Sequence, residues 1–293
     1  MGFESCHPAV NFIFFAAALY GTVCFNHPVF LAIAYVSAFA YSVRRCGKRA
    51  AAVNLCFLPL ILVFGLYYSS YHHFGVTVLR QNFIGNNLTV ESFVYGTVTG
   101  LRAAAVCMWL SCLFRVVSSD KVLYLFGRVS PRLSLFFTIL LRFIPRIGRE
   151  ARKTNLAQKG IGRGSNQGNL FRRLVNCLRM FSMLITWMIS ALVLESDSMR
   201  SRGSLLRGRT AFSIYRFDNR DRAFVIALFS GITLTAMGAI LGATTMFYNP
   251  RIIWKPLENL SAVTAVGYAA LCLLPMGLEF WTEYRFHRAR REV

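Results

Sequence analysis

The chain has 293 residues, of which 55% are hydrophobic and 15% charged, and its formal net charge is +21. A soluble domain is usually about 45–50% apolar, and here the excess is concentrated in long uncharged runs, which excludes an ordinary soluble globular protein. The charge alone would suggest nucleic-acid binding. The Lys and Arg residues instead collect between and after the apolar runs, as in the cytoplasmic loops of membrane proteins. We therefore expect a lipid bilayer as partner and no nucleic acid.

Six apolar runs are candidates for helices that cross a bilayer, which takes roughly 20 residues. They cover residues 10–25, 28–43, 52–68, 92–117, 223–247 and 260–281. Six crossings would bring the three basic clusters, at 44–49, 120–222 and 285–291, to the same side. The preference of Lys and Arg for the cytoplasmic side then predicts a multi-pass protein of the plasma membrane with both termini in the cytoplasm.

This pattern predicts three segments. Residues 1–117 hold transmembrane helices one to four, residues 118–222 form a cytoplasmic region, and residues 223–293 hold helices five and six with a basic tail. Between Asp120 and Arg222 the chain has 20 Lys and Arg residues against 6 Asp and Glu residues. This region is the large polar part of the chain, and we look for function there.

The cytoplasmic region begins with a short predicted helix over 121–127. Ser130-Pro131 then starts a long one, since proline is favoured at the first helical position, and that helix ends in the glycines between 160 and 168. Pro145 lies inside it and should kink it. Basic side chains recur at helical spacing on one face: Arg142, Arg146, Arg149 and Lys153.

A second long amphipathic helix is predicted over about 170–201. Only 15 uncharged residues separate Arg179 from Glu195, which is short for a crossing. We therefore expect this helix to lie beneath the membrane bundle. Glu195 and Asp197 are two positions apart and point in different directions on a helix, so we expect them to form ion pairs with Arg200 and its neighbours.

The sequence offers little for catalysis. It contains no GxxxxGK[ST], HExxH or GxSxG motif, and its five histidines and twelve acids are scattered. The eight cysteines include no CxxC pair, so they fit apolar packing better than a metal site. We expect a protein that is not an enzyme and that holds no metal or cofactor of its own.

Two arginine–glycine turns close the two long helices of the cytoplasmic region: Gly162-Arg163-Gly164 and Ser201-Arg202-Gly203. Taken singly, each is explained by helix capping, which favours glycine just past a helix end and arginine in the last turn. Because two such turns lie in one basic region, they also favour a two-point contact with a protein partner. The planar guanidinium group suits pairing with carboxylates and carbonyls.

These segments resemble a known family. Leu141-Arg142-Phe143-Ile144-Pro145, Glu150-Ala151-Arg152 and Ala157-Gln158-Lys159 resemble the first coupling helix of the transmembrane T component of energy-coupling factor (ECF) transporters, the cobalt-transport permease-like family. The run Asp197–Gly203 with Gly208-Arg209-Thr210-Ala211-Phe212 resembles the second coupling helix and its exit. His7-Pro8 and His27-Pro28 agree with the start of such a chain.

The resemblance implies an all-α polytopic membrane bundle with long amphipathic cytoplasmic coupling helices. It implies the energy-coupling subunit of an ECF-type ABC importer for vitamins or transition-metal ions. Its partners would be two cytoplasmic ABC-type ATPases, which bind ATP and magnesium, and a membrane S component that captures the substrate. The identity of the substrate would belong to the S component.

The resemblance also assigns site residues. The second ATPase-coupling tip is Ser201, Arg202 and Gly203, with serine in place of the family's alanine. By spacing from Ala157-Gln158 the first tip falls on Gly160-Ile161-Gly162, which lacks arginine, and Arg163-Gly164 two residues later is the alternative. Supporting positions in the coupling helices are Arg142, Pro145, Arg146, Glu150, Gln158, Asp197 and Arg209.

A different class of function also fits the charge. A basic membrane-anchored scaffold would bind anionic lipid or other partners without transport, because each Lys or Arg near an anionic leaflet contributes about 1 kcal/mol. Such a scaffold would depend on total charge. Coupling through two tips would depend on which arginine is changed.

Overall fold

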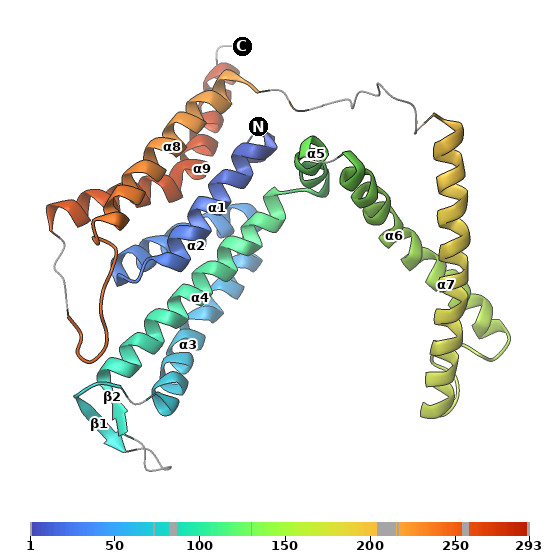
Figure 1. Cartoon of the computed structure of the whole chain (residues 1–293), viewed down its shortest axis with the longest axis horizontal. Helices are drawn as coiled ribbons and strands as arrows, with labels where there is room; N and C mark the ends of the chain where they lie inside the picture. Colours follow the sequence, from blue (N-terminus) through green and yellow to red (C-terminus); the bar gives the residue numbers. More distant parts are fainter. Residues whose placement is uncertain are drawn as a thin grey trace. The chain divides into compact units, whose positions relative to one another are not determined.

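The computed structural model describes residues 2–72, 74–81, 87–129, 131–203, 215, 217–253 and 258–291. These residues form nine α-helices, a 3-10 turn and a two-stranded hairpin (Figure 1). The chain divides into two compact units. Unit 1 comprises Met1–Ser118 and Tyr215–Val293, and unit 2 comprises Ser119–Ile214. The units meet after residues 118 and 214, whereas the predicted cytoplasmic region covers residues 118–222.

Unit 1 contains the apolar helices expected from the sequence. Its elements are η1 (Phe3–Ser5), α1 (Pro8–Cys24), α2 (Pro28–Cys46), α3 (Lys48–Tyr71), β1 (Val78–Gln81), β2 (Asn87–Thr89), α4 (Val90–Val116), α8 (Asn219–Ile240) and α9 (Asn259–Arg291). The ends of two helices differ most from prediction: α9 continues to residue 291 instead of 281, and α8 stops at residue 240 instead of 247. Gly242 has a φ of +75°, a conformation that ends a helix. The residues after Gly242 are uncharged, so the apolar run in the sequence extends past the true end of α8.

Two histidine–proline pairs start the first two helices in the same way. The Nδ1 atoms of His7 and His27 accept hydrogen bonds of 3.3 Å from the backbone N–H groups of Ala9 and Val29. Each histidine thereby satisfies one of the N–H groups that a helix start leaves unpaired, and the proline that follows occupies the first helical position, where its missing N–H costs nothing.

Helices α3 and α4 lie side by side (Figure 1), and glycines make their contact close. A Cβ on Gly96 would lie 3.0 Å from Gly65 Cα, and one on Gly100 would lie 3.3 Å from the Ile61 carbonyl oxygen. Gly96 and Gly100 are four residues apart, the small-xxx-small spacing that lets helix backbones approach in membranes. The opposite face of α3 is exposed, with only 11% of its most apolar window buried.

The core of unit 1 is aromatic. Phe3, Phe14, Phe15 and Trp109 are fully buried, and their ring centroids lie 5.3–6.3 Å apart in edge-to-face pairs. Phe224 of α8 joins them at 5.2 Å from Phe3. The cluster therefore ties the N-terminal turn to α1, α4 and α8.

Contacts inside unit 1 show which helix ends meet. Arg44 and Arg45 at the end of α2 pair with Glu279 in the second half of α9, and the His7 N–H at the start of α1 donates to Asp221 at the start of α8. In α4, Arg102 contacts the turn between α1 and α2, whereas Trp109 contacts Phe14 and Tyr41. Helix α4 therefore runs toward the same end, so the chain leaves unit 1 and re-enters it at one end.

Arg102, the charge placed deepest in an apolar run, holds that turn. Its guanidinium donates to the Phe25 carbonyl oxygen at 3.2 Å and to Asn26 Oδ1. Tyr248, beyond the end of α8, donates to the Asn26 carbonyl oxygen at 2.9 Å. The turn at Asn26 is therefore held by two segments that are distant in the sequence, one at Arg102 and one at Tyr248.

Among the described residues, six helices are long and apolar enough to cross a membrane: α2, α3, α4, α7, α8 and α9. This set is compatible with a multi-pass membrane protein. It differs from the predicted set at two places. Helix α1 has 17 residues and falls short, whereas α7, which was expected to lie beneath the bundle, qualifies by length and composition.

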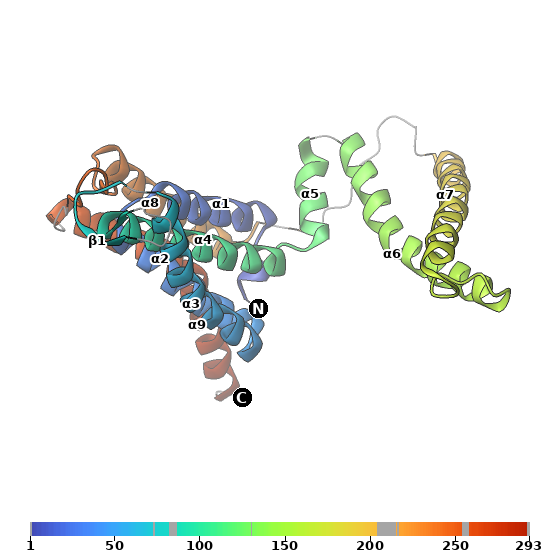
Figure 2. The same ribbon diagram turned by 90° about the horizontal axis from the view of Figure 1, so that it is seen from below.

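Unit 2 consists of α5 (Ser119–Val129), α6 (Pro131–Gly160) and α7 (Leu170–Ser201). Both long helices have the predicted bounds, and α5 is longer than expected because it continues past Gly127. Helices α5 and α6 contact each other, as do α6 and α7 (Figure 2). Helix α6 is continuous through Pro145.

Candidate functional site

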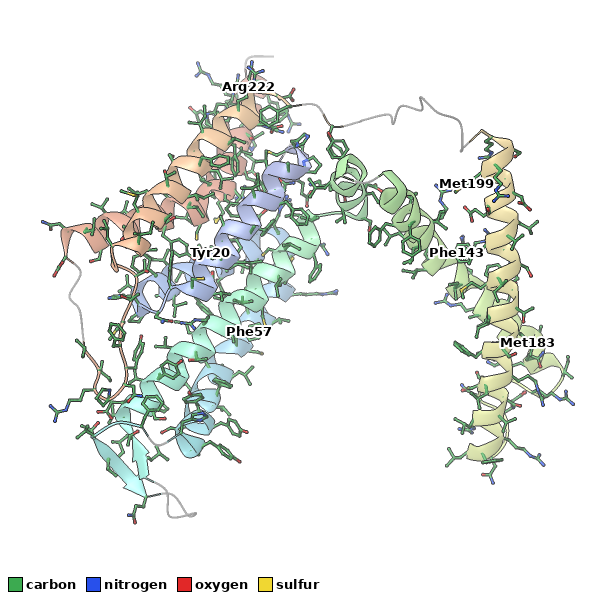
Figure 3. The ribbon with its side chains drawn as sticks, viewed as in Figure 1. Tyr20, Phe57, Phe143, Met183, Met199 and Arg222 are labelled. Atoms are coloured by element: carbon green, nitrogen blue, oxygen red, sulfur yellow. The ribbon has the colours of Figure 1, made fainter. Side chains whose placement is uncertain are left out.

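Helices α6 and α7 meet along a narrow apolar contact. Phe143 of α6 is 5% exposed, and its ring centroid lies 6.3 Å from that of Trp187 on α7. Nearer the turn between the helices, Gln158 Nε2 donates to Met183 Sδ at 3.7 Å. Figure 3 labels Phe143 and Met183 on the two helices. The predicted support residue Gln158 therefore contributes to this contact.

Arg146 bridges the same two helices. Its guanidinium lies 3.6 Å from Glu195 Oε2, and its carbon lies 5.5 Å from the centre of the Trp187 ring. The expected pairing of Glu195 with Arg200 is therefore wrong, because Glu195 faces α6 instead of the end of its own helix. Asp197 is exposed and has no ion pair among the described residues.

The rest of the basic stripe on α6 is open to solvent. Arg142, Arg149 and Lys153 are exposed, as is Pro145. Glu150 Oε2 lies 3.7 Å from Lys153 Nζ, one turn later on the same helix. Surface ion pairs of this kind contribute little to stability. Of these basic residues on α6, Arg146 is the one that contacts α7.

The first tip is a turn between α6 and α7 that is held by hydrogen bonds. Gly162 has a φ of +77°, and the Arg163 N–H donates to the Gln158 carbonyl oxygen at 2.9 Å. Asn155 Oδ1 accepts from Ser165 at 3.1 Å, and Asn176 Nδ2 donates to the Gly164 carbonyl oxygen at 3.3 Å. Side chains from both helices thus fix the backbone of the turn.

This turn contains both candidate positions for the first tip. Gly160 is the last residue of α6, Gly164 is buried, and the side chains of Ile161 and Arg163 are exposed. Asn155 and Asn176, which fix the turn, were not predicted as site residues. Their polar side chains near a run of glycines were the available signal.

The second tip ends α7 in a glycine cap. Gly203 has a φ of +72°, and its N–H donates to the Arg200 carbonyl oxygen at 2.9 Å. The Arg202 N–H and the Ser201 hydroxyl both donate to the Ser198 carbonyl oxygen, at 3.3 and 2.9 Å. The Arg202 side chain is exposed. Arg209 and its neighbours at 208–212 lie outside the described residues.

The two tips are set apart along α7. The first lies beside the N-terminal half of the helix, where Asn176 donates to the Gly164 carbonyl oxygen, and the second ends the helix. The separation of 26 residues between Asn176 and Arg202 spans about 39 Å at 1.5 Å per residue. Neither the Arg163 nor the Arg202 guanidinium has a hydrogen bond or ion pair within the part of the chain that the structure describes. Both donor groups are therefore available to another molecule.

The apolar faces of unit 2 are also uncovered. On α7, Phe171 is 78% exposed and Leu178 62% exposed, and Phe136 and Ile144 are exposed on α6. Soluble monomers rarely expose contiguous apolar patches of this kind without a partner or a membrane to cover them. Unit 2 therefore offers exposed apolar and cationic surface on the same two helices.

Within the described residues, no group of three or more His, Cys, Asp or Glu side chains is arranged to hold a metal ion. No model of a known protein family matches the chain, and no curated protein matches it.

Proposed function

We propose that this protein is the energy-coupling transmembrane subunit of an ECF-type ABC importer. It would transmit the motion of two cytoplasmic ABC-type ATPases to an S component that captures a vitamin or a transition-metal ion. The observation that carries the proposal is a pair of exposed arginine tips on one helix pair, the first beside the N-terminal half of α7 and the second at its end. A partner with two equivalent grooves, such as an ATPase dimer, suits two such separated contacts.

The arrangement of unit 1 supports a cytoplasmic position for unit 2. Because the chain leaves and re-enters unit 1 at one end, the segment between those points crosses a membrane an even number of times. Helix α6 carries Arg142, Arg146 and Arg149 in its middle, which makes a crossing by α6 costly. Helix α7 then has no second helix with which to return, and the shared end bears Arg44, Arg45 and the basic end of α9, as cytoplasmic ends do.

This topology requires α1 to cross with α2. A helix of 17 residues is about 25 Å long, somewhat shorter than the ~30 Å hydrocarbon core. Local thinning of the bilayer accommodates such a mismatch at modest cost. Both termini then lie in the cytoplasm of a multi-pass plasma-membrane protein.

To transmit force, each tip must keep its backbone conformation under load. The glycine cap at Gly203 and the asparagine contacts around Gly164 provide such fixed turns. An arginine on a fixed turn can pair in two places at once with a carboxylate or with backbone carbonyls of the partner. When ATP binding closes the ATPase dimer, the force on the two tips would reach α6 and α7, which are packed together through Phe143, Trp187 and Arg146.

The exposed apolar faces of α6 and α7 are available for the S component. Met180, Met183 and Met188 on α7 are adaptable side chains that pack against varied surfaces, and Met183 is already half-buried against α6. In this proposal the chain is not an enzyme. The ATPases bind ATP and magnesium and carry out hydrolysis.

The proposal is tested by co-purification in mild detergent with the tagged full-length chain from its own cells. We expect two ABC-type ATPases with the wild type and a loss of at least tenfold with Arg163→Glu/Arg202→Glu. The matched control is Arg222→Glu/Arg291→Glu, which changes the charge equally at exposed positions in unit 1, away from the tips. It should retain the ATPases, and Arg202→Glu alone should abolish substrate uptake.

Equal loss in both double variants would contradict coupling through the tips, because binding would then follow total charge, as in the scaffold alternative. Recovery of no ATPase with the wild type would overturn the proposal itself. Unchanged uptake by Arg202→Glu would remove the second tip from the coupling mechanism.

A further inference from the structure

Unit 1 contains an apolar groove between α8 and α9. Its volume is about 1020 Å³, and its wall on α9 is one continuous helix face that includes Leu274, Gly277 and Trp281. Helix α8 contributes Phe224 and Ala223 near its start. None of these side chains belongs to the tips of unit 2 or to the aromatic core, except that Phe224 forms the boundary with that core.

The groove crosses the level at which both helices change from charged to uncharged. Helix α8 has no charged residue from Ala223 to Ile240, and α9 has none from Asn259 to Leu278. These stretches of 18 and 20 residues are about 27 and 30 Å long as helices, close to the thickness of a bilayer core. The apolar part of the groove therefore lies at the depth of acyl chains and its other end at the depth of headgroups.

Two arginines line the headgroup end, one from each helix. Arg220 lies 3.9 Å from Asp221 Oδ1, a loose contact, and its buried Nε has no hydrogen-bond partner. Arg285 stacks 5.0 Å from the centre of the Trp281 ring and has no ion pair among the described residues. Both cations therefore keep capacity for an anion.

The nearest acids on α9 are already engaged. Glu279 accepts from Arg44 at 3.1 Å and pairs with Arg45 at 3.3 Å, and Glu283 pairs with Arg44 at 2.7 Å. These arginines belong to α2, so the acidic residues face α2. Asp218 and Asp221 stand at the start of α8, and the buried Asp221 accepts from the His7 N–H. Neither acid lines the groove, whose charged lining residues are Arg220 and Arg285.

We propose that this groove binds one anionic phospholipid from the cytoplasmic leaflet. Arg220 and Arg285 hold its phosphate from either side, and one acyl chain lies along Leu274 and Gly277. A soluble anion would leave the apolar wall uncovered, and a zwitterionic lipid would leave the excess positive charge uncompensated. The proposal depends on unit 1 lying in a bilayer and does not depend on the ATPase contact.

Native mass spectrometry of the full-length chain, released from detergent with added lipid, tests this directly. We expect retention of one phosphatidylglycerol at concentrations where phosphatidylcholine with the same acyl chains is lost. Arg220→Gln/Arg285→Gln should weaken retention at least tenfold. The control Arg222→Gln/Arg291→Gln removes the same charge from exposed positions on the same two helices and should stay within twofold of the wild type.

A second pair of variants tests the acyl-chain part of the groove. A Cβ on Gly277 meets no atom within 4 Å, so the side chain of Gly277→Leu starts in the open groove, and the substitution also favours the helix. It should reduce retention at least tenfold, whereas Gly277→Ala, which favours the helix but fills little space, should not. A thermal unfolding midpoint close to that of the wild type verifies that each variant is folded.

Equal loss in the two double-arginine variants would overturn the proposal in favour of non-specific surface charge. Unchanged retention in Gly277→Leu would place the lipid elsewhere and would overturn it as well, as would equal retention of the two lipid classes. A groove filled by a helix of a copurifying protein, displaced by neither lipid, would also contradict it.

Discussion

Three arginines of unit 1 contrast with two of unit 2. In unit 1, Arg44 and Arg45 are mostly buried against Glu279, and Arg102 donates to the Phe25 carbonyl oxygen in the turn between α1 and α2. In unit 2, Arg163 in the turn before α7 and Arg202 just after α7 are exposed. Buried charges must be paired because desolvation is costly, whereas exposed ones contribute little to the fold. Arg44, Arg45 and Arg102 therefore hold helices of unit 1 together, whereas Arg163 and Arg202 are free to bind.

The strongest way to test this contrast is to remove the acid that pairs with two arginines. Glu279→Ala leaves Arg44 and Arg45 partly buried without their shared partner, and we expect a loss of about 3–5 kcal/mol of unfolding free energy. Chemical denaturation in detergent measures it. The matched control is Glu283→Ala, because Glu283 also pairs with Arg44 but is 61% exposed, and it should cost at most about 1 kcal/mol. Similar losses in both would contradict the distinction.

Two glycine-to-alanine substitutions compare helix packing in the two units, with a smaller expected change in stability. Gly96→Ala puts a methyl group 3.0 Å from the backbone of α3 and should destabilise the protein by about 1–3 kcal/mol through overpacking. Gly148→Ala on α6 meets no atom within 4 Å and should stabilise its helix by about 0.5–1 kcal/mol. Thermal unfolding of the two variants in the same detergent compares them. A stabilising Gly96→Ala would mean that α3 and α4 are less closely packed than described.

The smallest effect is expected at the contact between α6 and α7. Arg146→Ala removes a half-exposed ion pair to Glu195 and the contact with Trp187, which together are worth about 1 kcal/mol. Amide hydrogen exchange should rise along the facing parts of α6 and α7 and stay unchanged in unit 1. Arg142→Ala, an exposed neighbour one turn earlier, serves as the control. Increased exchange in α3 or α4 would show that the contact supports more than unit 2.

The sequence predicted most helices well because each is marked by proline, glycine or a change of charge at its ends. Pro131 and the glycines after residue 159 bound α6 correctly, and Pro8 and Pro28 mark α1 and α2. The predicted end of α8 was too late, because the apolar run continues past the backbone turn at Gly242. Helix α7 was excluded as a crossing on charge alone, and composition does not exclude it.

Partners across helices were harder to predict than the helices. Glu195 was assigned to Arg200 because local spacing suggested it, but the rotation of α7 against α6 brings it to Arg146. The asparagines that fix the first tip contact residues 10 and 12 positions away, and no short motif encodes such pairs. The exposure of the tips, by contrast, follows from glycine and arginine at a helix end.

The separation of unit 1 into two stretches of sequence has a consequence for biosynthesis. The ribosome completes α4 before it makes the 96 residues of unit 2, and at about 5–20 residues per second that interval lasts about 5–20 s. During this time Arg44 and Arg45 lack their partner Glu279, because α9 has not been synthesised. The face of α2 that packs against α9 is therefore still exposed. The first four helices must therefore persist as an unfinished intermediate, and α9 completes the assembly as the last helix to emerge.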